Sequence, residues 1–259
     1  MTRTNLISTV IVGLASTAAN AGLVYVNPTS MSAGTVNSTE VGAKYRLSNS
    51  NWDMSLDNGA GTSSSSNFLS AGLGNNNQLS GRTYSFTLTH TAGQGFVFTM
   101  LDTASNAATT LSWGTFASPP GGTTAAALNG QTPNGSFNSL LLEAKAGGNN
   151  ASMQFSNLAF TSATLLNGGG SWQNGTLTPS TSGPGQAAGT WSQRLIADSD
   201  MSQHTWTLSG LLHGTRTGSS GGDELTKITI SGQDVAVVPT PGAMALLLTA
   251  GLVARRRRR

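Results

Sequence analysis

The feature that most constrains this chain is an alternation of apolar and hydroxyl side chains with a period of two residues. It is clearest at residues 84–90, where Tyr, Phe, Leu and His alternate with Ser, Thr and Thr. Successive side chains of a β-strand point to opposite faces, so this pattern predicts a strand with one buried and one solvated face. Residues 96–101 follow after a glycine-containing turn at 91–95, and the two runs together predict a β-hairpin.

Short runs of this kind recur along the chain between turns rich in Gly, Ser and Asn. The run at 137–146 also contains Leu, Glu, Ala and Lys, which favour a helix, but a glycine-rich turn leads it into another alternating run, so we assign it to a strand. Loops are expected at 58–67, 168–170 and 179–185. About ten short strands predict an all-β fold, an antiparallel β-sandwich with a jelly-roll-like strand order. The further strands are expected at 110–116, 152–158, 160–166, 191–197, 204–212 and 224–231.

Residues 1–21 have the organisation of a secretory signal peptide. A positive charge at Arg3 precedes an apolar stretch, and Ala19 and Ala21 form an A-x-A cleavage site. The mature chain is therefore expected to begin at Gly22. A buried first strand or helix is the alternative interpretation of the apolar stretch, but its flanking charge and small residues occur in the order typical of export.

The last residues, 238–259, consist of three parts. A short motif with two prolines blocks helix and sheet and leaves an extended, accessible peptide. The apolar segment that follows, 243–254, is shorter than the ~20 residues needed to span a bilayer, but the aliphatic stems of the arginines after it could extend it. The terminal arginines would hold this end on the cytoplasmic side of a membrane. The motif consists of Val238, Pro239, Thr240, Pro241 and Gly242, and the basic cluster of Arg255, Arg256, Arg257, Arg258 and Arg259.

This tripartite end resembles the PEP-CTERM sorting signal of bacterial exosortase substrates, in which a Pro-x-Pro motif precedes an apolar segment and a basic cluster. Thr240 stands where the name-giving motif has Glu. The resemblance implies that a membrane-embedded, transpeptidase-like exosortase cuts near the motif and passes the protein to the cell surface. Before processing, the apolar segment would be a sorting helix that anchors the chain in the membrane. An ordinary tail anchor or an unstructured tail is the alternative.

The body of the chain, residues 22–237, is expected to form one extracytoplasmic domain. Its runs at 79–88 (LSGRTYSFTL), 153–160 (MQFSNLAF) and 206–210 (WTLSG) are similar to those of the choice-of-anchor surface domains. The resemblance implies a β-rich domain placed ahead of a PEP-CTERM or other anchor, in a family with no established activity to carry over.

Charge and cysteine content exclude several functional classes. The net charge of +3 comes from the ends of the chain, because residues 22–238 contain seven Lys and Arg against ten Asp and Glu, a balance of −3 (7 − 10). The basic signal is therefore one terminal run and not a patch on a folded surface, so we expect no nucleic-acid partner. Cysteine is absent, which excludes a disulfide scaffold, a thiolate zinc site and a cysteine nucleophile.

Few residues could carry catalysis. Glu143 and Glu224 are the best candidates for the paired carboxylates of a glycoside hydrolase, but nothing in the sequence brings them together. His90 lies on the apolar side of its strand, where a half-buried, hydrogen-bonded imidazole is expected, and His204 and His213 flank another strand. We therefore expect the protein not to be an enzyme and to need no cofactor.

Two acidic clusters could hold Ca²⁺, namely Asp198 with Asp200 and Asp53 with Asp57. Neither matches the full signature of a calcium-binding loop. A solvated loop acid or an Asx turn is the alternative for each.

Trp52 and Trp172 are the candidate glycan contacts. Both lie in expected loops beside Asn, Gln, Gly and Ser. An exposed Trp among amides is typical of a sugar-stacking surface, because the ring supplies apolar contact and the amides supply hydrogen bonds. A loop Trp that closes the end of the sandwich is the alternative. Trp113 and Trp206 lie in alternating strands and are expected in the core.

Three functions are compatible with these features. The sequence favours an exported cell-surface or extracellular-matrix protein of structural or adhesive type, whose partners are an exosortase-type enzyme and, before processing, the membrane. A carbohydrate-binding module on an envelope or matrix polysaccharide is the second hypothesis. A hydrolase acting on such a polymer is the third.

Overall fold

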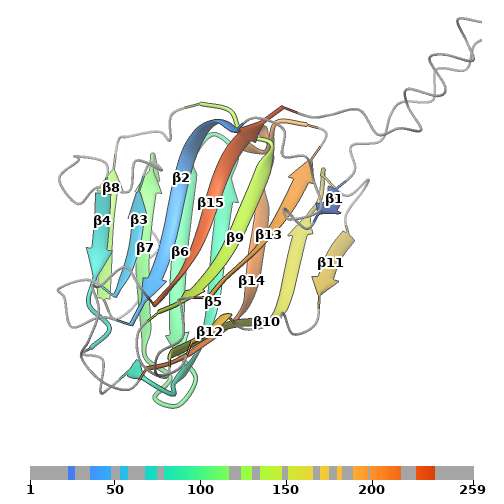
Figure 1. The fold of residues 1–259 in the computed structure, drawn as a ribbon. Helices are drawn as coiled ribbons and strands as arrows, with labels where there is room; N and C mark the ends of the chain where they lie inside the picture. Colours follow the sequence, from blue (N-terminus) through green and yellow to red (C-terminus); the bar gives the residue numbers. More distant parts are fainter. Residues whose placement is uncertain are drawn as a thin grey trace, which may run out of the picture.

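The structure of the protein is a computed structural model, and the part of the chain that it describes folds into fifteen β-strands and one short 3-10 helix, η1 (Met201–Gln203). The strands form two sheets that lie face to face (Figure 1). The described residues are 23–26, 36–47, 53–57, 68–74, 79–116, 124–129, 135–147, 151–165, 170–174, 180–182, 189–197, 199–216 and 226–236.

Sheet A has seven strands in the order β1-β13-β9-β15-β2-β3-β4, and all of its pairings are antiparallel. Strand β15, near the C-terminal end of the described chain, therefore pairs with β2 near its beginning. The strands of sheet A are β1 (Leu23–Val26), β2 (Val36–Arg46), β3 (Met54–Asp57), β4 (Phe68–Ala71), β9 (Ser139–Ala146), β13 (Gly189–Ala197) and β15 (Lys227–Val235).

Sheet B has eight strands in the order β11-β10-β14-β5-β6-β7-β8, and β12 pairs with β10 beside this path. Strands β7 and β8 run parallel, and the other pairings are antiparallel. The strands of sheet B are β5 (Thr83–Thr91), β6 (Gly95–Asp102), β7 (Ala108–Gly114), β8 (Thr124–Asn129), β10 (Ala151–Ser162), β11 (Gly170–Asn174), β12 (Ser180–Ser182) and β14 (Trp206–Thr215).

The all-β fold and the central hairpin confirm the expectations from the sequence. Strands β5 and β6 pair through Leu88 and Phe98, as the alternation predicted. The run at 137–146, which also had helical character, forms strand β9. It pairs with both β13 and β15, and these partners from distant parts of the chain bury its alternate residues.

Other expectations need correction. The two strands expected at 152–158 and 160–166 are one continuous strand, β10, because a β-bulge keeps it in register with β14. The expected loop at 179–185 contains the short strand β12. The strand expected to begin at His204 begins at Trp206, because η1 precedes it.

The core lies between the two sheets and is filled by alternate residues of every central strand. Trp113 and Trp206 are buried in it, as expected. At one end Trp206 contacts the rings of His90, Phe160 and Phe137, and its indole N–H donates to the carbonyl of Met201 at 3.1 Å. This aromatic cluster closes the end of the sandwich where η1 crosses from β13 to β14.

The terminal segments, 1–21 and 238–259, lie outside the described residues. Within the described part, no helix has the length and hydropathy needed to cross a membrane.

Candidate functional site

The residues that the sequence assigned to sorting and processing are not described by the structure. They are Ala19 and Ala21, the proline motif at 238–242 and the arginines at 255–259. Of the two candidate glycan contacts, Trp52 also lies outside the described residues. Trp172 was expected in a loop but lies in edge strand β11, opposite Phe160 of β10, because β10 supplies backbone partners to a segment that looks glycine-rich and irregular in sequence.

The acids considered for Ca²⁺ have structural partners where the structure describes them. The carboxylate of Asp57 is buried and lies 3.7 Å from the ammonium of Lys44. Asp53 is also buried, and its Oδ2 accepts a hydrogen bond from the backbone N–H of Leu73. Asp200 caps η1 by accepting from Ser202 at 2.9 Å, so it has the Asx-type role given as the alternative.

No group of three or more His, Cys, Asp or Glu side chains suited to a metal ion occurs among the described residues. Asp198, the other member of its cluster, is not described. Glu143 lies on the outward side of sheet A, where it is opposite Ser192 and Thr229 on the neighbouring strands. Glu224, its proposed partner in a hydrolase, lies outside the described residues.

The three histidines are held by hydrogen bonds, and that of His213 joins its Nδ1 to the hydroxyl of Thr83 at 3.2 Å. His90 is almost fully buried, and its Nδ1 donates to the carbonyl of His204 at 2.8 Å. Burial lowers the pKa of His90, and the hydrogen bond to that carbonyl and the charge of Asp200 offset this only in part. The half-buried His204 contacts the hydroxyl of Thr164 through its own Nδ1 at 2.7 Å.

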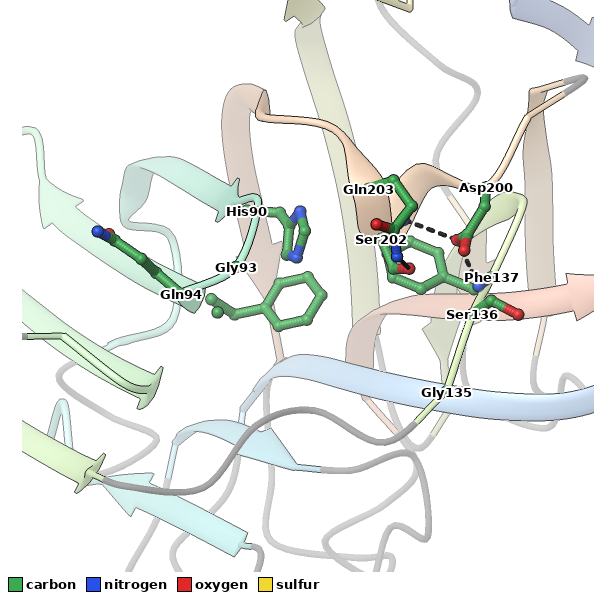
Figure 2. A pocket seen from close by; sticks show the side chains of 11 residues that line it. His90, Gly93, Gln94, Gly135, Ser136, Phe137, Asp200, Ser202 and Gln203 are labelled. Atoms are coloured by element: carbon green, nitrogen blue, oxygen red, sulfur yellow. Dashed lines mark hydrogen bonds between the residues drawn. The ribbon is translucent and has the colours of Figure 1, made fainter.

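A pocket of about 340 Å³ lies at this end of the sandwich (Figure 2). His90, Gln94 and the turn between β5 and β6 form one side, and Asp200 with Gln203 forms the other. The carboxylate of Asp200 accepts from the backbone N–H of Phe137 at 3.2 Å as well as from Ser202. The pocket is thus lined largely by groups that already hold the end of the sandwich together.

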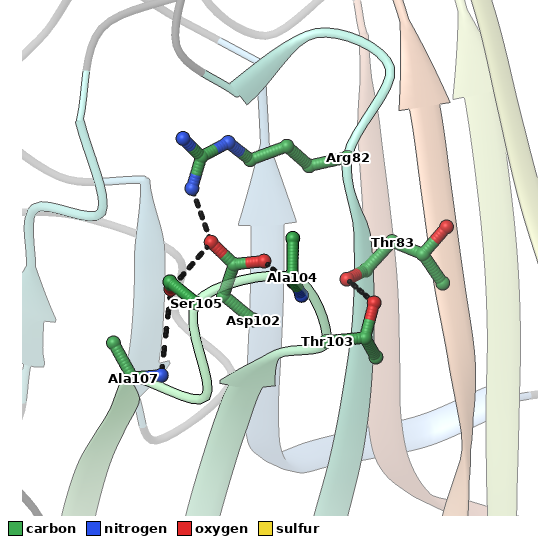
Figure 3. Close-up of polar contacts among 7 residues, drawn as sticks. All are labelled: Arg82, Thr83, Asp102, Thr103, Ala104, Ser105 and Ala107. Carbon is green, nitrogen blue, oxygen red and sulfur yellow. Dashed lines mark hydrogen bonds and ion pairs between the residues drawn. The ribbon is translucent and has the colours of Figure 1, made fainter.

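The opposite end of sheet B is fixed by a buried acid, Asp102 (Figure 3). Its carboxylate accepts from the guanidinium of Arg82, from the backbone N–H of Ala104 at 2.9 Å and from the hydroxyl of Ser105 at 2.8 Å. Desolvation alone would raise the pKa of Asp102, but these hydrogen bonds and the Arg82 charge hold it below its usual value. The network closes the turn between β6 and β7.

The two sheets differ sharply in charge. Among the described strands of sheet B, Asp102 is the only Asp, Glu, Lys or Arg, and it lies at the last position of β6. The strands of sheet A carry nine such residues, on β2, β3, β9, β13 and β15. These nine are Glu40, Lys44, Arg46, Asp57, Glu143, Lys145, Arg194, Lys227 and Asp234.

The outward side of sheet B is covered mainly by hydroxyl groups. We use the name hydroxyl face for the outward residues of four adjacent strands, β10, β14, β5 and β6. Some of its hydroxyls contact each other across strands: Thr89 with Thr207 at 3.1 Å, and Ser152 with Thr215 at 2.6 Å. The hydroxyl face comprises Thr83, Ser85, Thr87, Thr89 and Thr91 of β5, Val97, Thr99 and Leu101 of β6, Thr207, Ser209, Leu211, His213 and Thr215 of β14, and Ser152, Gln154, Ser156, Asn157, Ala159 and Thr161 of β10.

A groove of about 450 Å³ lies in the middle of the hydroxyl face. Ser85 is the register partner of both Leu211 on β14 and Leu101 on β6, so an apolar side chain stands on each side of a small hydroxyl. The groove is lined by Ser85, Phe86, Thr87, Thr99, Leu101, Asn157, Ser209, Gly210 and Leu211.

The bulge in β10 brings Asn157 to the rim of this groove. The register between β10 and β14 shifts between Ser156 and Ala159, and Asn157 adopts a left-handed backbone with φ of 51°. Asn tolerates this conformation better than most residues, and a bulge of this kind redirects a side chain. Across from the bulge, Gly210 leaves room for Phe86 and Leu158, which a side chain there would meet at under 3.0 Å.

The sequence showed the alternation that produces the hydroxyl face but not the groove, whose residues come from four strands. Comparison with protein-family models finds no match for the chain, and a search of curated proteins finds no matching sequence. The hydroxyl face, its groove and the difference in charge between the two sheets are the features of the molecule that point to a function.

Proposed function

We propose that the protein is an exported cell-surface or extracellular-matrix protein of adhesive type, without catalytic activity, and that the hydroxyl face is its contact surface. The observation that carries this proposal is the segregation of charge: among the strands of sheet B that the structure describes, Asp102 at the end of β6 is the single charged residue. Charged side chains are normally spread over the surface of a soluble domain. An outward sheet face without them is therefore unusual, and a role in contact explains it.

Among the described residues of the contact surface there is no carboxyl group to cleave a glycoside. All of the groove's lining residues are uncharged. General acid–base catalysis of glycoside cleavage needs two carboxyl groups on opposite sides of the scissile bond. Glu143 cannot supply one of them here, because it lies on the outward side of the other sheet.

Export and sorting complete the proposal and rest on the two ends of the chain. We infer that a signal peptide is cleaved after Ala21 and that the tail 238–259 directs the protein to an exosortase, with the apolar stretch as a transient membrane helix. The sandwich between them would have a jelly-roll-like order, since the chain passes from sheet to sheet between β9 and β10 and again between β12, β13, β14 and β15. The placement of this domain outside the cytoplasm suits its lack of cysteine and its neutral face.

Cell fractionation of two tail variants tests this proposal. A deletion of residues 239–259 should leave the domain folded but move the protein from the cell surface to the culture medium. Replacement of the five terminal arginines by glutamine should give unprocessed protein that remains in the membrane fraction. A tail-deleted protein that is still found at the surface in full amount would contradict the sorting assignment, and protein confined to the cytoplasm would contradict export.

A further inference from the structure

We propose that the groove of the hydroxyl face binds an uncharged polysaccharide, with a sugar ring lying between Leu101 and Leu211 over Ser85. This inference rests on the proposed function and names the ligand class of its contact surface. It assigns binding to side chains of β5, β6, β10 and β14 rather than to Trp52 or Trp172.

The groove has the mixture of groups that a sugar requires. Leu101 and Leu211 are register neighbours of Ser85 on opposite sides, and adjacent strands lie about 4.8 Å apart, so the two apolar side chains are separated by about two strand spacings. They can contact the C–H face of a ring, while Ser85 between them offers a hydroxyl to its substituents. The volume of the groove, about 450 Å³, also falls within the range typical of small-molecule sites.

Three of the four hydroxyl side chains that line the groove are available to a ligand. The fourth, Thr99, contacts Thr110 of the neighbouring strand β7 at 3.1 Å, and outside the groove Thr89 contacts Thr207 at the same distance. The side chains of Ser85, Thr87 and Ser209 make no hydrogen bond to any other described residue. Each can therefore donate to and accept from a sugar hydroxyl without breaking a contact within the protein.

Asn157 adds an amide at the rim of the groove. Its left-handed backbone at the bulge turns an exposed side chain out of the regular alternation of β10. An amide offers two donors and one acceptor with two lone pairs, which matches pairs of neighbouring sugar hydroxyls. The bulge thus places an amide, which is both a hydrogen-bond donor and an acceptor, at the rim of a groove that otherwise presents mainly hydroxyl and apolar groups.

Charge decides between neutral and anionic polymers. An acidic polysaccharide would normally be bound by Lys or Arg, and the described strands of sheet B contain neither. The single charge on those strands, Asp102, is an acid held by Arg82 at the end of the sheet. An uncharged polymer loses less hydration on such a face and is repelled by nothing on it.

Affinity electrophoresis of the exported protein, recovered from the envelope of its host, tests this inference. The probes are the host's own envelope polysaccharides, separated by anion exchange into a neutral and an anionic fraction. We expect the neutral fraction to retard the protein and the anionic fraction to leave it unaffected. Retardation should change by less than about twofold between low and high salt, because no charge pair is formed.

Three variants locate the binding site. Thr87→Glu places a charge in the groove and should weaken binding about tenfold or more. The control is Thr190→Glu, at an exposed position of β13 on the other sheet, which should leave binding unchanged. Asn157→Gly keeps the left-handed backbone but removes the amide, so binding should weaken about two- to tenfold at unchanged stability.

The inference is overturned if neither fraction binds, if only the anionic fraction binds, or if the two Thr→Glu variants behave alike. Sedimentation velocity of the wild-type protein tests whether a second copy of the chain binds to the face instead. Self-association that Thr87→Glu abolishes would show that the face is a contact between two copies. If one of these results is obtained with a protein that fractionation still finds at the cell surface, the polysaccharide ligand is refuted but the proposed adhesive function is not. A cytoplasmic protein would refute the proposed function itself.

Discussion

Substitution of Gly210 by Ala tests whether the bulge and the core beneath the groove are packed as described. A Cβ at this position would lie 2.8 Å from Cδ2 of Leu158 and 2.9 Å from Cε1 of Phe86. Ordinary contacts of this type begin at 3.4 Å, so each neighbour would have to move by about half an ångström. Phe86 is not free to move, because its ring packs edge-on against Phe155 with centroids 6.0 Å apart.

The expected cost follows from two opposing effects. Overpacking of a close-packed core by one methyl group costs about 1–3 kcal/mol. Replacement of Gly by Ala also lowers the conformational entropy of the unfolded chain, which stabilises the folded state by about 0.4–1 kcal/mol. We therefore expect Gly210→Ala to lower the free energy of unfolding by about 1–2 kcal/mol, which corresponds to about 2–8 °C in melting temperature for a domain of this size.

A double-mutant cycle with Leu158→Ala identifies the cause. Leu158→Ala alone should cost about 2–5 kcal/mol by leaving a cavity. In the Gly210→Ala background the same truncation removes the clash with Leu158, though not that with Phe86, so its cost should be smaller by about 1 kcal/mol. Urea unfolding followed by tryptophan fluorescence measures all four proteins. A Gly210→Ala variant as stable as wild type, or additive effects of the two changes, would refute the described packing at the bulge.

Three further predictions concern charge and packing elsewhere. Asp102→Asn should lower the free energy of unfolding by about 1–3 kcal/mol at neutral pH. Because the pKa of Asp102 is depressed in the folded protein, its carboxylate stabilises the fold above pH 3.8, and this stabilisation is lost as the pH falls below that value. The melting temperature of the variant should therefore depend less on pH in this range than that of the wild type. His90, whose pKa is also depressed, should make wild-type stability fall as pH drops below 6.5, and His90→Gln should remove that decline in the same thermal scans. Gly42→Ala should cost about 1–3 kcal/mol in urea unfolding, since its Cβ would lie 2.7 Å from Oδ1 of buried Asp57; wild-type stability in this variant would show that the buried carboxylate has room to move.

The parts of the fold that the sequence predicted are those with local alternation. The hairpin of β5 and β6 was foreseeable because each strand carries its own two-residue pattern and a short turn joins them. Strand β2 was not foreseeable, because its outward residues Gly42, Lys44 and Arg46 lack the hydroxyl pattern. Its partner β15 also lies at the other end of the described chain. Long-range pairing, rather than local propensity, makes that segment a strand.

The groove could not be predicted because it depends on which strands are neighbours. Ser85, Leu101 and Leu211 each appeared in the sequence as an outward residue of a separate strand, and only the register between the strands brings them together. The bulge at Asn157 was likewise invisible, since it exists only relative to β14. Trp172 was assigned to a loop because of its glycine-rich surroundings, yet it pairs with β10 at the edge of the sheet.

Export and sorting are decided by the intact mass of the protein recovered from its native envelope. We expect a chain that begins at Gly22 and ends between Val238 and Gly242, which would mean that both terminal segments have been removed during export and sorting. A mass that includes residues 243–259 would contradict cleavage of the tail. A mass that includes residues 1–21 would contradict export by a cleaved signal peptide, and with it the surface location on which the adhesive function depends.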